Sequence, residues 1–469
     1  MFVENFIIFG LGSVISRIIP YLMLPLIVSI FPDSSYMGIN DTLTVFVVFG
    51  TNIAVMGIYD VMYRLFFEKE DLGYQTDVTS TSLFIVTLSS LLFFGLVMLF
   101  RGGLAKLFFE NHNYAWLVQL GGGTIMFSSL NIILSAPTRM QNKRKLYIFI
   151  NTLAPLISYG ISIPMLLSGQ YILALPLAAM ITAFLSCAVY LFLNKSYFRR
   201  CQIKMNLLVN MLRIAVPIIP SFIFYWVLSS IDRIMITNMI GLSQTGVYAF
   251  TANLAKVSMI IYFAFSGGFQ YFAFSTMKDQ DHMELISRVL DYLCGLSCFV
   301  LCVVIPLPKL VFASFFPIEY YQGWAIFPLL FACPLVLMLF QTISTQFLVV
   351  KKSWPSSIIL AFGASLTITL NFLLIRFMGV KGAAIGTFSG YVFSVVMAAI
   401  VLMKMKLIRI QLRLALSAVL AIVGLLTHMA ELPDYFIYPF CGISLLVIAH
   451  LYFQDALNVL KNFYSQKSA

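Results

Sequence analysis

Four cations fall inside long apolar stretches of the chain, where a charge is costly: Arg17, Arg64, Arg233 and Lys256. An ionised side chain near the centre of a bilayer costs roughly 2.5 to 3.5 kcal/mol on insertion scales, so it is usually found beside a partner or a watery cavity. Guanidinium and ammonium groups are the side chains that bind phosphate oxygens. If these cations face one cavity, they predict a binding site for a phosphorylated, anionic molecule.

Arg17 and Lys256 lie nearest to mid-depth, each about eleven residues into its predicted helix at 1.5 Å per residue. Neither has an acidic residue within one turn of its own helix. A role in substrate binding is therefore our first interpretation of both. The alternative is a structural ion pair with an acidic residue of another helix, for which the sequence offers three candidates: Asp41, Asp60 and Asp232.

Arg233 and Arg64 have acidic neighbours on their own predicted helices. Arg233 follows Asp232 directly, and Arg64 comes four residues after Asp60, a spacing that allows pairing along one helix face. Arg64 is also close enough to the helix end to reach the cytoplasmic interface. Local pairing is thus an alternative to substrate contact for both arginines.

The same three aspartates are candidates for ion coupling. Asp41, Asp60 or Asp232 could carry H⁺ or Na⁺, although each could equally be a structural partner of a cation. We expect no bound cofactor beyond such an ion. The seven cysteines fall mostly within helices and the four histidines are scattered, so we expect no metal site.

The composition indicates which kind of structure carries these charged residues. The chain has 61% apolar and 10% charged residues with a mean hydropathy of +0.96, which indicates a bilayer as the main solvent. Crossing roughly 30 Å of hydrocarbon takes about 20 apolar residues, so we expect an all-α polytopic membrane protein with about 14 transmembrane helices. We place them near 6–30, 42–66, 78–100, 114–135, 147–167, 171–193, 207–239, 245–275, 285–306, 324–348, 356–378, 380–403, 410–428 and 436–454.

The net charge of +11 comes from an excess of Lys and Arg residues, and their positions indicate how the chain is oriented in the membrane. Most Lys and Arg residues fall at the helix ends that are cytoplasmic if the N-terminus is cytoplasmic, and an even number of spans puts both termini there. These cations are dispersed over short loops, so we expect no nucleic-acid partner. The first residues carry Glu4 and no cation, and the apolar run that follows is too long for a cleavable signal, so we expect the first helix to be retained.

The two halves of the chain resemble each other at an offset of 208 residues, which brings the turn around Gly38 onto the turn around Gly246. We therefore predict two six-helix bundles, related by a pseudo-two-fold axis along the membrane normal, followed by two additional helices. The predicted divisions are an N-terminal bundle over 1–193, a cytoplasmic linker over 194–206, a second bundle over 207–403, and two helices with a cytoplasmic tail over 404–469. Duplicated bundles of this kind usually transport a substrate by alternating access.

Several short segments follow one another in a characteristic order along the whole chain. The strongest are the run from Arg213 to Ser221 with Pro217 and Pro220, the Ser-Ile-Asp-Arg motif that ends at Arg233, and the run from Gly241 to Tyr248. Three further segments add to them: 36–38, 64–68 and 379–387. Together these segments resemble the Wzx-type polysaccharide flippases of the multidrug/oligosaccharidyl-lipid/polysaccharide exporter superfamily.

The resemblance implies a flippase that moves an undecaprenyl-pyrophosphate-linked oligosaccharide across the bacterial cytoplasmic (inner) membrane by alternating access. Such a flippase serves the synthesis of surface polysaccharides such as O-antigen of lipopolysaccharide, capsule or exopolysaccharide. Its partners would be the lipid-linked oligosaccharide and the bilayer, together with a polysaccharide polymerase and chain-length proteins. The Asp232–Arg233 pair is carried over directly from the matching motif.

Two other function classes stay open. A cation-coupled multidrug exporter of the same superfamily would share the helix count, although a cavity for cationic drugs should favour carboxylates over Arg17 and Lys256. A membrane-embedded polysaccharide enzyme should show a large extramembrane loop or a clustered acidic site, and neither is evident. The chain also lacks a G-x-x-x-x-G-K-[ST] loop, so we expect a transporter that does not itself hydrolyse ATP.

Overall fold

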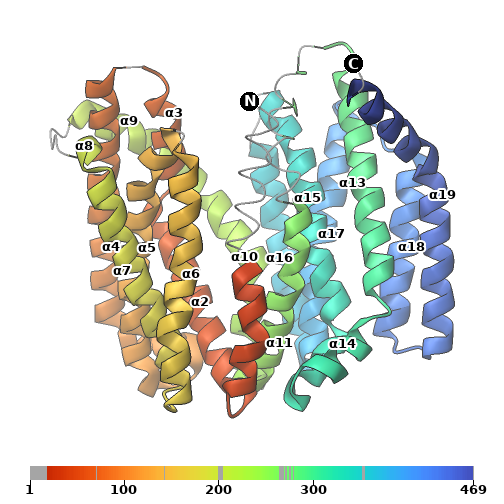
Figure 1. Cartoon of the computed structure of the whole chain (residues 1–469), viewed down its shortest axis with the longest axis horizontal. Coiled ribbons are helices and arrows are strands. Elements are labelled where there is room, and N and C mark those ends of the chain that lie inside the picture. The colour runs from red at the N-terminus through yellow and green to blue at the C-terminus, as the bar shows by residue number, and fades with distance from the viewer. Residues whose placement is uncertain are drawn as a thin grey trace. The chain divides into compact units, whose positions relative to one another are not determined.

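The structure is a computed structural model that describes residues 18–69, 71–141, 143–198, 204–262, 269, 272–273, 276–277, 279–350 and 354–467. Every regular element in these ranges is a helix, which confirms the predicted all-α class (Figure 1). Arg17 lies outside the described residues.

Within the described part of the chain, twelve helices are long and apolar enough to cross a membrane. The exact count of fourteen is not confirmed. Two of the predicted spans are not among the twelve: the first is described only over Ile18–Ile30, and the span predicted over 245–275 is described in part.

The chain divides into two compact units, Met1–Ala249 and Phe250–Ala469, which we call unit 1 and unit 2. The division falls about two helices after the predicted linker at 194–206, because the first helices beyond that linker pack in unit 1. These compact units do not test the predicted sequence repeats, which stay a prediction.

Unit 1 is a helical bundle in which α4 packs on α5, α5 on α7, and α6 on α7 (Figure 1). Its elements after the helix Ile18–Ile30 are α2 (Ser34–Val55), α3 (Ile58–Phe66), α4 (Leu72–Phe109), η1 (His112–Tyr114), α5 (Ala115–Met140), α6 (Arg144–Leu167), α7 (Ala174–Leu193), α8 (Lys195–Phe198), α9 (Met205–Ala215), η2 (Val216–Ile218), α10 (Ile219–Ile240) and α11 (Leu242–Ala255), the last of which continues past the division.

Two helices that we predicted as continuous are broken in unit 1. The span predicted over 42–66 is two helices, because Met56 and Gly57 adopt left-handed backbone angles (φ 49° and 68°) between α2 and α3. The span predicted over 207–239 is interrupted by the 3-10 turn η2, where Pro217 and Pro220 each remove a backbone donor. The break between α2 and α3 lies just before Asp60 and Arg64, which we expected to be functional.

Unit 2 continues with η3 (Lys256–Ser258), α13 (His282–Val304), α14 (Pro308–Phe315), η4 (Ile318–Ala325), α15 (Phe327–Val349), α16 (Trp354–Met378), α17 (Val380–Lys404), α18 (Leu412–Met429) and α19 (Asp434–Lys467). The short elements α14 and η4 were not predicted, because we treated the segment between the spans at 285–306 and 324–348 as a loop. Aromatic packing orders this segment: the ring of Phe312 lies 5.3 Å from that of Phe316 and 5.8 Å from that of Phe327.

The two C-terminal helices α18 and α19 are tied to α13 inside unit 2. Arg413 Nε lies 2.5 Å from the buried Asp291 Oδ2, and Arg413 Nη1 lies 2.5 Å from Asp455 Oδ2. The Tyr452 hydroxyl donates to Asp291 Oδ1 at 3.0 Å. This cluster joins the start of α18 to interior positions of α13 and α19.

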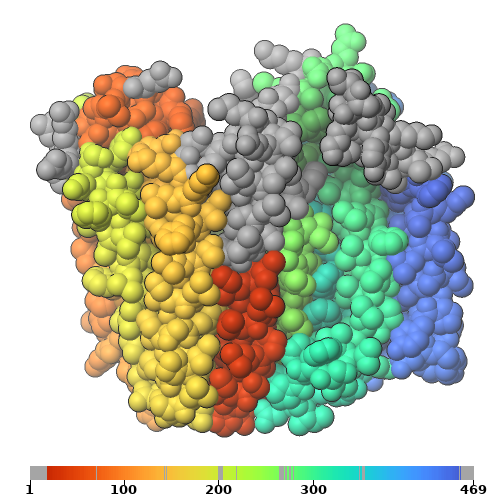
Figure 2. Space-filling view, viewed as in Figure 1, coloured from red at the N-terminus to blue at the C-terminus, as the bar shows by residue number. Residues whose placement is uncertain are grey.

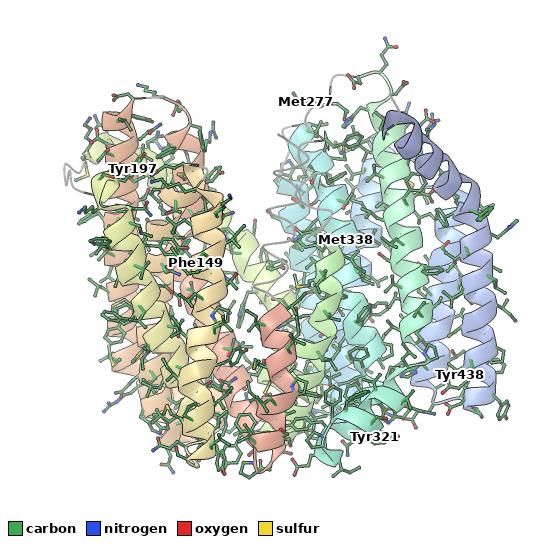
Figure 3. The ribbon with its side chains drawn as sticks, viewed as in Figure 1. Phe149, Tyr197, Met277, Tyr321, Met338 and Tyr438 are labelled. Carbon is green, nitrogen blue, oxygen red and sulfur yellow. The ribbon has the colours of Figure 1, made fainter. Side chains whose placement is uncertain are left out.

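Outward faces of the helices carry large apolar side chains, as lipid contact requires. Figure 2 shows α6 as a continuous column of side chains, and its exposed residues include Phe149, Leu153, Leu156 and Leu167. In unit 2, α19 exposes Tyr438 near one end (Figure 3). These faces support the reading of both units as membrane-embedded.

Candidate functional site

A buried charge cluster in unit 1 joins α2, α10 and α11. Arg233 Nε lies 2.7 Å from Asp41 Oδ2, and Arg233 Nη1 lies 3.1 Å from Asp232 Oδ1. The Tyr248 hydroxyl donates to Asp232 Oδ2 at 2.6 Å. The side chains of Arg233, Asp41 and Asp232 are only 4 to 6% exposed. The cluster is therefore a desolvated, hydrogen-bonded ion network of the kind that is rare inside a membrane without a specific role.

Close packing between the backbones of α2 and α11 brings the residues of this cluster together. A Cβ atom on Gly38 of α2 would clash with the carbonyl oxygen of Leu242, and one on Gly246 of α11 would clash with the carbonyl oxygen of Ser34. The two helices thus meet backbone to backbone. The Ser34 and Ser243 hydroxyl oxygens lie 2.8 Å apart beside this contact, and they hold the same two helices together.

This contact is reciprocal under the 208-residue offset found in the sequence. Gly38 corresponds to Gly246 and Ser34 to Leu242, and each glycine contacts the residue that lies four positions before the other glycine: Gly38 contacts Leu242, and Gly246 contacts Ser34. A Cβ on Gly38 would lie 3.0 Å from Gly246 N, and one on Gly246 would lie 3.1 Å from Gly38 N. When residue i of one repeat contacts residue j of the other, and residue j of the first contacts residue i of the second, the two repeats are related by two-fold symmetry. The equivalent turns of the two predicted repeats therefore pack against each other.

Arg233 is held on several sides. Besides its two carboxylates, Nη1 donates to the carbonyl oxygen of Ser229 at 2.8 Å, and the guanidinium lies 5.8 Å from the centroid of the Tyr248 ring. Asp232 also accepts from the backbone N–H of Arg233 at 2.8 Å. A guanidinium with this many fixed partners positions its carboxylates as much as they position it.

Lys256 lies at the start of the 3-10 turn η3 in unit 2. It is half-buried, and its Nζ donates to Asn253 Oδ1 at 2.7 Å. The change from α-helical to 3-10 geometry at this residue marks an irregular point within the predicted span. Whether Lys256 binds substrate stays a prediction, as it does for Arg17.

Arg64 and Asp60 are both exposed on α3, and among the ion pairs of the described residues the Asp60–Arg64 pair is absent. Arg64 thus remains available to another anion. The structure brings Asp41, Asp232 and Arg233 together, and it places Asp60 and Arg64 on a separate short helix of the same unit.

The sequence analysis did not identify one residue of the cluster, Tyr248, and one of its pairings, that of Asp41 with Arg233. Tyr248 was quoted only as part of a family segment, and its hydroxyl proves to bind Asp232. Asp41 was considered as a partner for Arg17 or Lys256 but not for Arg233. Gly241 is the sequence signal that could have indicated the tyrosine, because a glycine with a φ of 96° there joins α10 to α11, and the two helices then contact each other through Thr237–Thr245 and Asp232–Tyr248. In the described part of the chain, no three His, Cys, Asp or Glu residues gather closely enough to hold a metal ion.

The family model described as "Polysaccharide biosynthesis protein" matches residues 34–316, more than half of the chain and all of the cluster. No curated protein sequence matches the chain.

Solved structures share the fold. Lipid II flippase MurJ, in an inward closed conformation, aligns with a TM-score of 0.70 at 16% identity, over 96% of this chain and 100% of that one. A multidrug resistance MATE family transporter of the MOP superfamily, inward-facing, aligns with a TM-score of 0.63 at 14% identity, over 82% and 94%. The Vibrio cholerae MATE transporter VcmN aligns with a TM-score of 0.60 at 12% identity, over 86% and 96%. With the family match, these likenesses confirm the predicted resemblance to the Wzx-type proteins: the chain belongs to the polysaccharide biosynthesis protein family.

Proposed function

We propose that the protein is a flippase that moves a polyprenyl (undecaprenyl) pyrophosphate-linked oligosaccharide across the bacterial cytoplasmic membrane by alternating access. Both termini would lie in the cytoplasm. The product would feed the synthesis of a surface polysaccharide such as O-antigen or capsule, next to a polymerase and chain-length proteins. The observation that carries the proposal is the family match over 34–316, and the shared fold with a lipid II flippase supports it.

The predicted cations supply the chemistry that the substrate needs. A pyrophosphate carries several acceptor oxygens, which guanidinium and ammonium groups bind well. We propose Arg17, Lys256 and Arg64 as direct contacts. Arg233, already bound to two carboxylates, acts on the substrate through the arrangement of α2 and α10.

The carboxylates of the cluster are our candidates for energy coupling. Asp41 and Asp232 bring two negative charges against one positive charge on Arg233. A cation from elsewhere in the chain, a proton or Na⁺ would neutralise the excess. We propose that Asp41 or Asp232 carries the coupling ion, with Asp60 on α3 as the third candidate. Replacing the aspartate that carries the ion, by Asp41→Asn or by Asp232→Asn, should then abolish stimulation of transport by a proton or Na⁺ gradient, whereas undiminished stimulation in both variants would contradict this assignment.

A multidrug exporter is the second candidate, because MATE transporters share the fold. Expression of the chain in a drug-sensitive host distinguishes the two. Increased drug resistance without any effect on surface polysaccharide would favour the exporter.

The proposal is tested by complementation in a host that lacks the gene. We expect the wild-type chain to restore surface polysaccharide, and Arg17→Ala and Lys256→Ala to abolish export at normal protein level and membrane insertion. Lys195→Ala is the matched control, since Lys195 is an exposed cation at the start of α8 in unit 1. Normal export in both site variants would contradict the assignment of these residues.

A further inference from the structure

The short helix α3 of unit 1 has two different faces. One face is buried in the core and consists of Ile58, Val61, Met62, Leu65 and Phe66. The other face presents Tyr59, Asp60, Tyr63 and Arg64, and it extends past the helix end to Phe67. Because α3 has only nine residues, it cannot span the membrane by itself.

Three aromatic rings form a continuous row along the outer face. Tyr59, Tyr63 and Phe67 recur every four residues, a spacing that aligns them on one side of a helix. The ring centroids of Tyr59 and Tyr63 lie 6.1 Å apart, and those of Tyr63 and Phe67 lie 5.4 Å apart. Tyr63 is 40% exposed and Phe67 58% exposed. The three rings thus lie side by side, and two of them, Tyr63 and Phe67, are exposed.

Arg139, at the end of α5, contacts the aromatic row at Tyr59. Its Nη1 donates to the Tyr59 hydroxyl at 2.7 Å, and its guanidinium carbon lies 5.3 Å from the centroid of the Tyr147 ring. Arg139 is exposed, as is Arg64. Among the described residues, no carboxylate lies within ion-pair distance of either arginine. Two cations are therefore available beside the aromatic row.

We propose that this face, which we call the α3 aromatic face (Tyr59, Tyr63, Phe67, Arg64 and Arg139), binds the sugar rings of the lipid-linked substrate. This inference rests on the proposed function. The C–H faces of pyranose rings are positively polarised and pack on the negative faces of aromatic rings. The arginines would bind an anionic group on the saccharide or its pyrophosphate.

The carboxylates on the same segment favour a sugar over a lipid headgroup as the occupant. Asp60 is exposed between Tyr59 and Tyr63, and it can accept hydrogen bonds from sugar hydroxyls. Anionic lipid headgroups repel carboxylates, so a carboxylate beside the rings favours an occupant that presents hydroxyl groups. Glu68, just past α3, adds a second negative charge, and it accepts from the Tyr74 hydroxyl at 3.3 Å.

The test compares two probes on the full chain in nanodiscs of phosphatidylcholine. One probe is the lipid-linked oligosaccharide that accumulates when the gene is deleted, extracted from those cells, and the other is undecaprenyl pyrophosphate without sugar. We expect Tyr63→Leu to bind the saccharide probe roughly three- to tenfold more weakly than wild type while binding the sugar-free lipid unchanged. Tyr63→Phe should behave as wild type, because it keeps the ring. Tyr438→Leu is the matched control, since Tyr438 is 49% exposed on α19 of unit 2.

Each alternative result has a definite meaning. Equal binding of the saccharide probe by wild type and Tyr63→Leu overturns the inference and leaves the proposed function standing. Equal weakening of both probes, or the same loss in Tyr438→Leu, overturns it in favour of a bilayer anchor or a structural role. Failure of the wild-type chain to bind either probe counts against the proposed function itself.

Discussion

Removal of Arg233 is the sharpest test of the buried cluster. Arg233→Ala would leave Asp41 and Asp232 buried beside each other without the guanidinium that now lies 2.7 Å and 3.1 Å from them. Breaking a buried ion pair on one side typically costs about 3 to 5 kcal/mol, because the remaining charge is uncompensated. For a unit the size of Met1–Ala249, that corresponds to a fall in Tm of roughly 6 to 20 °C.

The assay is thermal unfolding of the purified chain in detergent, followed by the loss of soluble monomer. A variant that neutralises all three side chains (Asp41→Asn, Asp232→Asn, Arg233→Gln) should recover much of the loss, because no unpaired charge remains. Arg288→Ala is the control, since Arg288 forms an exposed pair with Glu284 that solvent screens. An unchanged Tm in Arg233→Ala, or a larger fall in the neutral variant, would refute the reasoning. Loss of export with an unchanged Tm would point instead to direct substrate contact by Arg233.

Two further predictions concern helix packing. Gly246→Ala should destabilise unit 1 by about 1 to 3 kcal/mol, because the new methyl group meets the Ser34 carbonyl oxygen; Gly95→Ala on α4, with open space around it, should have no such effect in the same unfolding assay. Arg413→Ala should loosen α19 from α13 by leaving the buried Asp291 without its cation, which limited proteolysis of α19 would detect as faster cleavage; an unchanged cleavage rate would speak against the clamp.

Hydropathy was sufficient for the fold class because a membrane imposes one length and one composition on every span. It did not predict the break between α2 and α3, since that break depends on the left-handed angles of Met56 and Gly57. Met is an unusual residue at positive φ, so only Gly57 carried a signal. The prolines of η2 were visible in the sequence, yet we read the stretch as one helix because membrane helices often tolerate proline.

The sequence allowed us to predict which charged residues form the site, but not which of them pair with one another. The rarity of charge in an apolar chain singled out Asp232 and Arg233, and the repeat offset singled out Gly38 and Gly246. The pairing of Arg233 with Asp41 depends on how closely α10 approaches α2, which the glycine contact between α2 and α11 permits but does not specify. The α3 aromatic face escaped notice because aromatic residues are common in this chain, and only the fold shows which of them form a row.

Reconstituted transport tests the central claim most directly. The purified chain would be placed in liposomes with the lipid-linked oligosaccharide that accumulates in the deletion strain, and the substrate in the outer leaflet would be measured over time with an impermeant sugar-modifying reagent. We predict movement between leaflets that requires the chain and is lost in Lys256→Ala. Equal movement in protein-free liposomes, or none with the wild-type chain under a proton or Na⁺ gradient, would contradict the account.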